Sequence, residues 1–465
     1  MEISETKRVY FVGIGGIGMA ALARYYMSLG LPVAGYDRTE SPLTDEIVRE
    51  GATVSYADSL DAVPEAFRSP EGTLVVYTPA VPEANVPLTF FRQGGFEVRK
   101  RAWVLGQVTR NSKGLCFSGT HGKTTTSSMA AHILHSGPVG CNAFLGGILK
   151  GYNSNLMLSA TSPYSVIEAD EYDRSFHQLT PYVAIVNATD PDHLDIYGTE
   201  EAYLESFAHF TELIRPDGFL LVHTGLKLVP RPQQGVRTYT FGRSEGDFHA
   251  TNVRIGGGTI VFDFVHPEGV ITDIELGVPV DINVDNAISA LAAVWLTGTL
   301  TPELARSAMR SYPGVERRFE FHLKEAGPKG HVIIDDYAHH PDELTRSIAS
   351  VRALYPGRKL TVAFQPHLYS RTRDFAPQFA AALDAADEVI LIDLYPAREQ
   401  PIPGISSQTI LDLVKNENKT LIPKELFVDT MKNRNFEILL TVGAGDLNLF
   451  VPRLAQAVAV TEGQQ

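Results

Sequence analysis

Residues 116–126 read C-F-S-G-T-H-G-K-T-T-T and decide the fold of the central part of this chain. An apolar run at 114–117 leads into a loop that ends in Gly-Lys-Thr, and a pattern rich in Ser and Ala follows. A strand, a glycine loop and a helix in this order form a P-loop, whose backbone N–H groups surround phosphate oxygens. Lys123 supplies a mobile positive charge, and the hydroxyl of Thr124 stands where Mg²⁺ is commonly bound.

The loop is shorter than the common phosphate-binding pattern. That pattern requires glycine at position 117, where Phe117 stands, so Gly119 and Gly122 form a contracted G-x-x-G-K-T instead. The contracted pattern taken by itself also admits a chance match. The nucleotide site that it predicts therefore needs support from the rest of the chain.

Strand-like apolar runs alternate with glycine turns and helical patterns on both sides of this loop, which predicts α/β layers with mostly parallel sheets. These runs cover residues 8–12, 73–77, 114–117, 183–187, 332–334 and 359–364. A chain of 465 residues suggests about three domains. We predict domains at 1–111, 112–312 and 313–465, with an antiparallel accessory sheet between 238 and 279.

A second glycine turn lies near the amino end. Residues 9–18 read V-Y-F-V-G-I-G-G-I-G, with Gly13, Gly15 and Gly18 at G-x-G-x-x-G spacing between a strand-like and a helical pattern. Such glycines let backbone amides approach a diphosphate at the amino end of a helix, and Asp37 is placed to bind ribose hydroxyls. These residues alone favour an NAD-dependent enzyme, with a purely structural turn as the alternative.

Composition limits the classes of partner. The net charge is -14, from 40 basic and 54 acidic residues, so no global positive field attracts a nucleic-acid backbone. The two cysteines, Cys116 and Cys141, supply neither a disulfide framework nor a four-ligand zinc site, which favours the reducing cytoplasm. No apolar stretch is convincing as a membrane span of about 20 residues. The sequence predicts no oligomeric state.

The contracted loop, G-T-H-G-K-T-T at 119–125, resembles that of the Mur ligase superfamily, which builds the peptide of bacterial cell-wall precursors. The similarity extends over nearly the whole chain. Further segments of this kind are E-A-D-E at 168–171, D-H-L-D at 192–195, R-R-F-E at 317–320 and D-D-Y-A-H-H-P at 335–341. The resemblance implies a Rossmann-like first domain, a central P-loop ATPase-type α/β domain with a small antiparallel sheet, and a Rossmann-like third domain.

Within the superfamily, three features resemble most the members that add L-alanine to UDP-N-acetylmuramate. They are G-I-G-G-I-G-M at 13–19, the doubled histidine at 339–340, and Q-P-H-L-Y-S-R-T-R at 365–373, and the histidine inside the P-loop, His121, adds to them. In the implied reaction the γ-phosphate of ATP moves onto the lactyl carboxylate of the sugar, and the amine of L-alanine attacks the acyl phosphate. The resemblance therefore implies ATP and Mg²⁺, with UDP-N-acetylmuramate and L-alanine as the other small-molecule partners.

The resemblance also implies roles for individual residues. Lys123 contacts the β and γ phosphates, and Arg318 reaches the γ phosphate from the third domain. Thr124 and Glu168 bind one magnesium ion, while His193 contacts a second. The implied ATP-binding set is Gly119, Thr120, His121, Gly122, Lys123, Thr124, Thr125, Asn286, Asp336 and Tyr337. The implied UDP-sugar set is Gly13, Gly15, Gly16, Gly18 and Asp37, and the amino acid pocket is His339, His367 and Arg371.

Each of these features also has a structural interpretation. A lone histidine such as His193 is more often structural than a metal ligand. The acidic residues at 168–171 are also compatible with a solvated run, although Val166 and Ile167 before them indicate the carboxyl end of a strand. A buried core tyrosine is the competing interpretation of Tyr337.

Three residues depart from the family pattern. Leu368 stands where relatives usually carry arginine, and Asp285 and Ser289 flank Asn286 where many relatives have histidine and a second asparagine. Several sister ligases also use a carbamylated lysine at a second magnesium, at a position that falls on Phe207 in this chain. We therefore predict a second metal that needs no carbamate.

Three rival functions remain at this point. The first is the related recycling ligase, which attaches a whole tripeptide to the same UDP-sugar. The others are a dinucleotide-dependent oxidoreductase and a nonenzymatic nucleotide-binding regulator. The segment 365–373 speaks against the first, and Lys123, Glu168 and His193 together speak against the other two.

Overall fold

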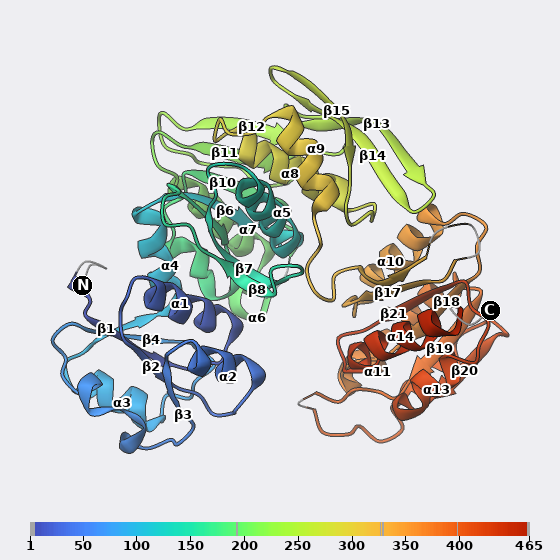
Figure 1. Ribbon diagram of the computed structural model, residues 1–465, viewed down its shortest axis with the longest axis horizontal. Helices are drawn as coiled ribbons and strands as arrows, with labels where there is room; N and C mark the ends of the chain where they lie inside the picture. The colour runs from blue at the N-terminus through green and yellow to red at the C-terminus, as the bar shows by residue number, and fades with distance from the viewer. Residues whose placement is uncertain (1–4, 192–193, 326, 328–329, 398, 463–465) are drawn as a thin grey trace. The chain divides into compact units, whose positions relative to one another are not determined.

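The computed structural model in Figure 1 describes residues 5–191, 194–325, 327, 330–397 and 399–462. The chain forms two compact units. The first consists of Met1–Thr251, Asp263–Ile274 and Asp285–Tyr312, and the second of Asn252–Phe262, Glu275–Val284 and Pro313–Gln465. Both are α/β in class, as the alternation of runs predicts. The boundaries near 111 and 312 stay a prediction.

The amino-terminal sheet has five parallel strands in the order β3-β2-β1-β4-β5. β1 lies in the middle and is buried from Val9 to Val12, as expected for a parallel strand covered on both faces. The strands are β1 (Arg8–Val12), β2 (Val33–Tyr36), β3 (Thr53–Ser55), β4 (Thr73–Tyr77) and β5 (Glu97–Lys100). The helices are α1 (Ile17–Ser28), α2 (Pro42–Arg49), α3 (Val86–Gln93) and α4 (Arg101–Arg110).

The second sheet of the first unit has seven strands in the order β12-β11-β10-β6-β9-β7-β8, parallel except for the β7–β8 pair. β6 lies at its centre. The strands are β6 (Lys113–Ser118), β7 (Asn142–Leu149), β8 (Ser154–Met157), β9 (Tyr164–Glu168), β10 (Val183–Val186), β11 (Phe219–His223) and β12 (Arg237–Phe241). The helices are α5 (Lys123–Ser136), α6 (Leu194–Tyr197), α7 (Glu200–Glu212), α8 (Asn283–Trp295) and α9 (Pro302–Ser311).

The predicted accessory sheet is present as three consecutive strands, β13 (His249–Gly256), β14 (Thr259–His266) and β15 (Gly269–Glu275), in the order β13-β14-β15. The Gly-Gly-Gly turn at 256–258 joins the first two. All three glycines have positive φ, between 60° and 151°. This left-handed backbone is the conformation that glycine supplies at little cost.

Helix α5, which follows the P-loop, is buried along Thr126–Leu134 on all sides. A helix that is covered all round is a core element of a large domain, and the half-buried first turn, residues 123–125, faces the P-loop. No helix in the described ranges is both long enough and apolar enough to cross a membrane.

The six-stranded sheet of the second unit has the order β16-β17-β21-β18-β19-β20, and only β16 is antiparallel to its neighbour. The strands are β16 (Glu320–Lys324), β17 (Val332–Asp336), β18 (Leu360–Phe364), β19 (Glu388–Ile392), β20 (Lys419–Ile422) and β21 (Ile438–Val442). The helices are α10 (Pro341–Leu354), α11 (Tyr369–Leu383), α12 (Ser407–Leu411), α13 (Phe427–Met431) and α14 (Val451–Glu462).

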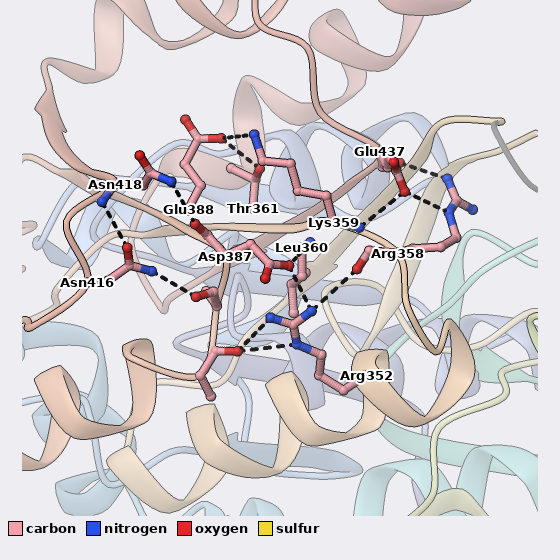
Figure 2. Close-up of polar contacts among 12 residues, drawn as sticks. Arg352, Arg358, Lys359, Leu360, Thr361, Asp387, Glu388, Asn416, Asn418 and Glu437 are labelled. Carbon is pink, nitrogen blue, oxygen red and sulfur yellow. Dashed lines mark hydrogen bonds and ion pairs between the residues drawn. The ribbon is translucent and has the colours of Figure 1, made fainter.

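Paired charges close the amino edge of this sheet (Figure 2). Arg352 on α10 contacts Asp387 at 2.8 Å, Lys359 contacts Glu388 at 3.1 Å, and Glu437 accepts a hydrogen bond from the Lys359 backbone N–H at 3.1 Å. Because these charges pair with one another, they stabilise the edge. Ligands of open α/β sheets bind at the opposite edge, at the carboxyl ends of the strands.

Candidate active site

The loop 119–122 joins β6 to α5 and requires glycine at two positions. Gly119 has φ 135° and Gly122 has φ 81°. An added Cβ at Gly119 would lie 2.7 Å from the backbone N of Ala188, and one at Gly122 would lie 2.8 Å from Oδ1 of Asn286. Both the backbone conformation and the lack of space therefore exclude side chains at these two positions, so the contracted loop requires both of its glycines.

Lys123 is held in a buried ion pair at this loop. Its Nζ donates to the carbonyl oxygen of Gly119 at 2.6 Å and to Oε1 of Glu171 at 2.8 Å. The side chains of Lys123 and Glu171 are 15% and 1% exposed. Burial raises the pKa of Glu171, while the nearby Lys123 lowers it. The other carboxylate oxygen, Oε2, has no hydrogen-bond partner in the described part of the chain.

Glu168 ends β9 and lies beside the start of α5. Its Oε2 accepts the backbone N–H of Gly146 at 3.0 Å, and the Thr124 hydroxyl is hydrogen bonded to the same carboxylate. An added Cβ at Gly146 would overlap this carboxylate. Burial raises the pKa of Glu168, against the lowering effects of Thr124 and Lys123.

The residues expected to bind the first magnesium ion fit a hard cation. Thr124 and Glu168 bring together a hydroxyl and a carboxylate, the oxygen donors that Mg²⁺ prefers. A cation would also offset the burial of the Glu168 charge. His193, expected at a second ion, lies outside the described residues. Among the residues that are described, no group of three or more His, Cys, Asp or Glu is placed to hold a metal.

Three predicted nucleotide residues lie on the loop and its helix. The hydroxyl of Thr120 donates to the carbonyl oxygen of Asp190 at 2.7 Å and is hydrogen bonded to the Tyr203 hydroxyl at 2.9 Å. These contacts fasten the loop to its surroundings. His121 is exposed, and Thr125 is half-buried in the first turn of α5.

Asn286, on α8, is brought to the P-loop helix. Its Oδ1 accepts the hydroxyl of Thr126 at 3.2 Å, and that hydroxyl also accepts the amide of Asn187 at 3.3 Å. Ser289, one turn further along α8, donates to Oδ1 of Asn187 at 2.9 Å. The departure at Ser289 thus has a structural role, because its hydroxyl orients an amide beside the loop. Asp285 instead pairs with Arg243 at 3.2 Å.

The amino-terminal glycine turn is closed by Asp37. Its Oδ2 accepts the backbone N–H of Gly15 at 2.7 Å, and its Oδ1 accepts that of Thr39 at 3.2 Å. Gly13 has φ 92°, in the left-handed region. Gly16 is the extended residue that precedes α1. The carboxylate therefore lies against the predicted diphosphate loop, and its contact with a ribose stays a prediction.

Arg101 is a residue of this turn that the sequence reasoning missed. An added Cβ at Gly18 would lie 2.6 Å from Nη1 of Arg101, so the guanidinium covers the first turn of α1. Its Nη2 also lies 3.6 Å from Oδ2 of Asp170. The available signal was its place at the carboxyl end of β5, the edge where β1 delivers its glycine turn.

In the second unit, Tyr337 lies against two guanidinium groups. The carbons Cζ of Arg317 and Arg318 lie 4.7 Å and 5.3 Å from the centre of its ring. Arg317 is fixed, because its Nη2 donates to the carbonyl oxygens of Gly443 and Gly445, each at 2.9 Å. Tyr337 is half-buried, and the interpretation as a buried core tyrosine is wrong.

Asp336 ends β17 directly before Tyr337. Its Oδ1 accepts the backbone N–H of Phe319 at 3.2 Å. Burial is the main cause that raises the pKa of this carboxyl, and the hydrogen bond from the Phe319 backbone N–H lowers it. Asp336 and Tyr337 are therefore neighbours at the carboxyl edge of the sheet, as their positions predict, and their contact with ATP stays a prediction.

His339, His367 and Arg371 lie together at the carboxyl ends of β17 and β18. The rings of His339 and His367 are 6.2 Å apart, and Arg371 Nη1 donates to Nδ1 of His367 at 3.2 Å. Burial lowers the pKa of both histidines. The neutral form of His367 is the one that can accept this hydrogen bond.

Leu368 precedes α11 with φ 69°, a left-handed conformation that is costly for a branched side chain. Its backbone N–H donates to the carbonyl oxygen of Tyr395 at 3.0 Å. The backbone at this position is therefore fixed by a tertiary contact. The second unit gathers its own predicted residues, and the first unit gathers the P-loop set.

Family models match three consecutive parts of the chain. The model described as Mur ligase family, catalytic domain, matches residues 8–113, that of the Mur ligase middle domain matches 117–294, and that of the Mur ligase, glutamate ligase domain, matches 317–454.

Two curated relatives are similar over almost their whole length. The UDP-N-acetylmuramate--L-alanine ligase of Parabacteroides distasonis is 58% identical over 452 residues, which are 97% of each chain. The relative of the same name from Phocaeicola vulgatus is 54% identical over 455 residues, 98% of each chain. The crystal structure of UDP-N-acetylmuramate-alanine ligase from Thermotoga maritima aligns with a TM-score of 0.78 at 25% identity, over 98% of this chain and 100% of that one.

Proposed function

The chain belongs to the Mur ligase family, and from that premise we propose that it joins L-alanine to the lactyl carboxylate of UDP-N-acetylmuramate with ATP. The observation that carries this function is the 58% identity, over 97% of both chains, to a ligase named for these substrates. The reaction belongs to peptidoglycan precursor synthesis. The dinucleotide-dependent oxidoreductase and the nonenzymatic regulator are not favoured.

The P-loop supports the role proposed for Lys123 in phosphoryl transfer. Negative charge develops on the γ phosphate as it moves to the substrate carboxylate, and an ammonium group beside the loop stabilises that charge. Lys123 starts the helix behind the loop, so its charge and the helix amino end act in the same direction. We propose that the N–H groups of 119–125 bind the phosphates of ATP.

We propose Mg²⁺ as the cofactor held by Thr124 and Glu168. Bound there, the ion supplies charge neutralisation for the phosphate oxygens. The backbone N–H of Gly146 donates a hydrogen bond that orients the Glu168 carboxylate in advance. The raised pKa of Glu168 fits a carboxylate that lacks a strong counter-charge. His193 remains the proposed contact of a second ion.

We propose that several residues of the second unit contact ATP or L-alanine. Arg318 is proposed to contact the γ phosphate, and Asp336 and Tyr337 the nucleoside. His339, His367 and Arg371 are proposed for L-alanine. An arginine is suited to this task, because its planar fork binds a carboxylate with two hydrogen bonds.

The test is ADP release by the full-length protein with ATP, Mg²⁺ and UDP-N-acetylmuramate, with single amino acids or the recycling tripeptide as acceptors. We expect turnover with L-alanine and none when either the sugar nucleotide or the amino acid is omitted. Lys123→Ala is expected to reduce kcat by at least about a hundredfold, the order found for one transition-state donor. Turnover with the tripeptide but not with L-alanine would favour the recycling ligase instead.

A further inference from the structure

Glu171 is a buried charged residue at the phosphate loop for which the proposed reaction has no role. Glu168, three positions earlier, is the carboxylate proposed for magnesium. Glu171 instead contacts Lys123 at 2.8 Å and is 1% exposed. A buried carboxylate is costly without compensation, so its presence at this loop requires a reason.

Glu171 offsets the positive charge of Lys123, which is the charge proposed to bind the nucleotide phosphates. Lys123 donates one hydrogen bond to Glu171 and a second to the carbonyl oxygen of Gly119, which belongs to the loop itself. In this arrangement the Lys123–Glu171 pair has no net charge, because the carboxylate lies at contact distance from the ammonium, and the attraction for an entering phosphate is weakened. The loop then offers a nucleotide its backbone N–H groups and the helix end.

The carboxylate is the fixed partner of the pair. The backbone oxygen of Glu171 accepts the Tyr197 hydroxyl at 2.5 Å. The next turn contains Asp173 and Arg174 with φ 52° and 54°, a conformation that non-glycine residues adopt where the surroundings enforce it. Asp173 is paired with Lys100 at 2.8 Å, but this pair is largely exposed and contributes little to holding the turn. Lys123 has a long flexible side chain, so it is the partner that moves.

We propose that Glu171 is a positioning residue that holds Lys123 away from the phosphate position in the nucleotide-free protein and releases it to nucleotides that carry a β phosphate. The inference rests on the proposed ATP-dependent function. A polyphosphate competes with Glu171 for the ammonium, whereas a monophosphate lacks the group that Lys123 is proposed to contact. Glu171 thereby makes the site selective for nucleoside di- and triphosphates.

Removing the charge of Glu171 is expected to strengthen polyphosphate binding. If only protein with Lys123 released from Glu171 binds a polyphosphate, the apparent affinity equals the intrinsic affinity multiplied by the fraction of protein in which Lys123 is released. Glu171→Gln keeps the size and the hydrogen-bond acceptor but removes the charge. We expect ADP to bind roughly 3- to 10-fold more tightly to this variant, which corresponds to a released fraction of about a tenth to a third in the native protein.

The experiment is calorimetric titration of the full-length protein with ADP and with AMP at fixed Mg²⁺. The matched control is Asp173→Asn, which removes one charge from the same turn without touching Lys123. We expect Glu171→Gln to tighten ADP binding and leave AMP binding unchanged, and the control to change neither. Glu171→Asp, which withdraws the carboxylate by one methylene, serves if the first variant does not fold and is expected to act in the same direction.

Unchanged or weaker ADP binding by a folded Glu171→Gln variant would overturn the proposal, because a purely structural carboxylate predicts that result. Equal tightening for ADP and AMP would also overturn it, since that is a general electrostatic effect. If the native protein binds no adenine nucleotide, the proposed function itself fails. Native binding that Glu171→Gln leaves unaltered rejects only the role of Glu171.

Discussion

Replacing Lys123 with methionine removes the ammonium and keeps a side chain of similar length. Glu171 then has no counter-charge, and its Oε2 already has no partner in the described part of the protein. We predict that Lys123→Met is less stable than the native protein and that the loss grows as the pH rises. This effect is separate from the loss of activity.

Two effects bound the size of the loss, the lost attraction between the two charges and the protonation of Glu171. Two charges 2.8 Å apart attract with about 6 kcal/mol at an effective dielectric constant of about 20, before the desolvation cost is subtracted. Protonation of Glu171 limits the loss, because a neutral carboxyl needs no counter-charge. With an unfolded-state pKa of about 4.3, the ceiling is about 3.7 kcal/mol near pH 7 and about 1.6 kcal/mol near pH 5.5.

The sign of the pH dependence follows from the direction of the pKa shift. Burial raises the pKa of Glu171 in the folded protein, and removing Lys123 removes a group that lowers it. A carboxyl with a raised folded-state pKa destabilises the fold only above its unfolded-state pKa. The loss is therefore nearly absent at about pH 4 and increases until the folded-state pKa is reached.

The assay is thermal unfolding of the native protein, Lys123→Met and the double variant Lys123→Met/Glu171→Gln, at about pH 5.5 and about pH 7. At about 2 to 4 °C per kcal/mol, these ceilings let the first transition of Lys123→Met fall by at most about 7 to 15 °C near pH 7 and by at most about 3 to 6 °C near pH 5.5. Glu171→Gln should restore most of the loss. A shift that is equal at both pH values, or that the second substitution leaves in place, would refute the reasoning.

Three further predictions concern ligands. Glu168→Gln should raise the Mg²⁺ concentration for half-maximal ADP release by about 10- to 100-fold, the scale seen when support of a metal site is lost, whereas Asp173→Asn should not change it. Arg101→Ala should weaken calorimetric binding of UDP-N-acetylmuramate by about tenfold while ADP affinity is retained, because only the cation at the glycine turn is lost. Activity should be equal in bicarbonate-free and ordinary buffer, since Phe207 is a fully buried core residue that binds no metal, and should fall in His193→Ala.

The phosphate loop and the amino-terminal turn could be predicted because their requirements are local. Gly119 and Gly122 sit where positive φ and close backbone contacts exclude a Cβ, and sequence spacing records that requirement directly. The parallel sheets could also be predicted, because a strand that is buried on both faces requires a continuous run of apolar residues, which is a local property of the sequence. The sequence therefore predicted much of the fold and the position of the P-loop.

The pairing of charges could not be predicted, because it depends on contacts between distant segments. Glu171 belongs to an acidic run that is equally compatible with a solvated surface. It is buried because of its place after β9 and the fold of the turn that follows, which the run itself does not indicate. Arg101 approaches Gly18 across 83 positions of sequence. Asp285 and Ser289 found partners in Arg243 and Asn187, which no local pattern indicates.

The position of β21 has a consequence for how the protein is made. This strand, Ile438–Val442, lies in the interior of its sheet, between β17 and β18, although it is the last strand of that sheet to be synthesised. A nascent chain that has already emerged as far as β20 still lacks the strand that joins the two halves, and the inner edges of β17 and β18 stay unpaired. Exposed strand edges and apolar faces favour aggregation and chaperone binding. The sheet can therefore close only late in translation, and a ribosome that stalls between residues 423 and 437 leaves a chain whose second unit cannot complete this sheet.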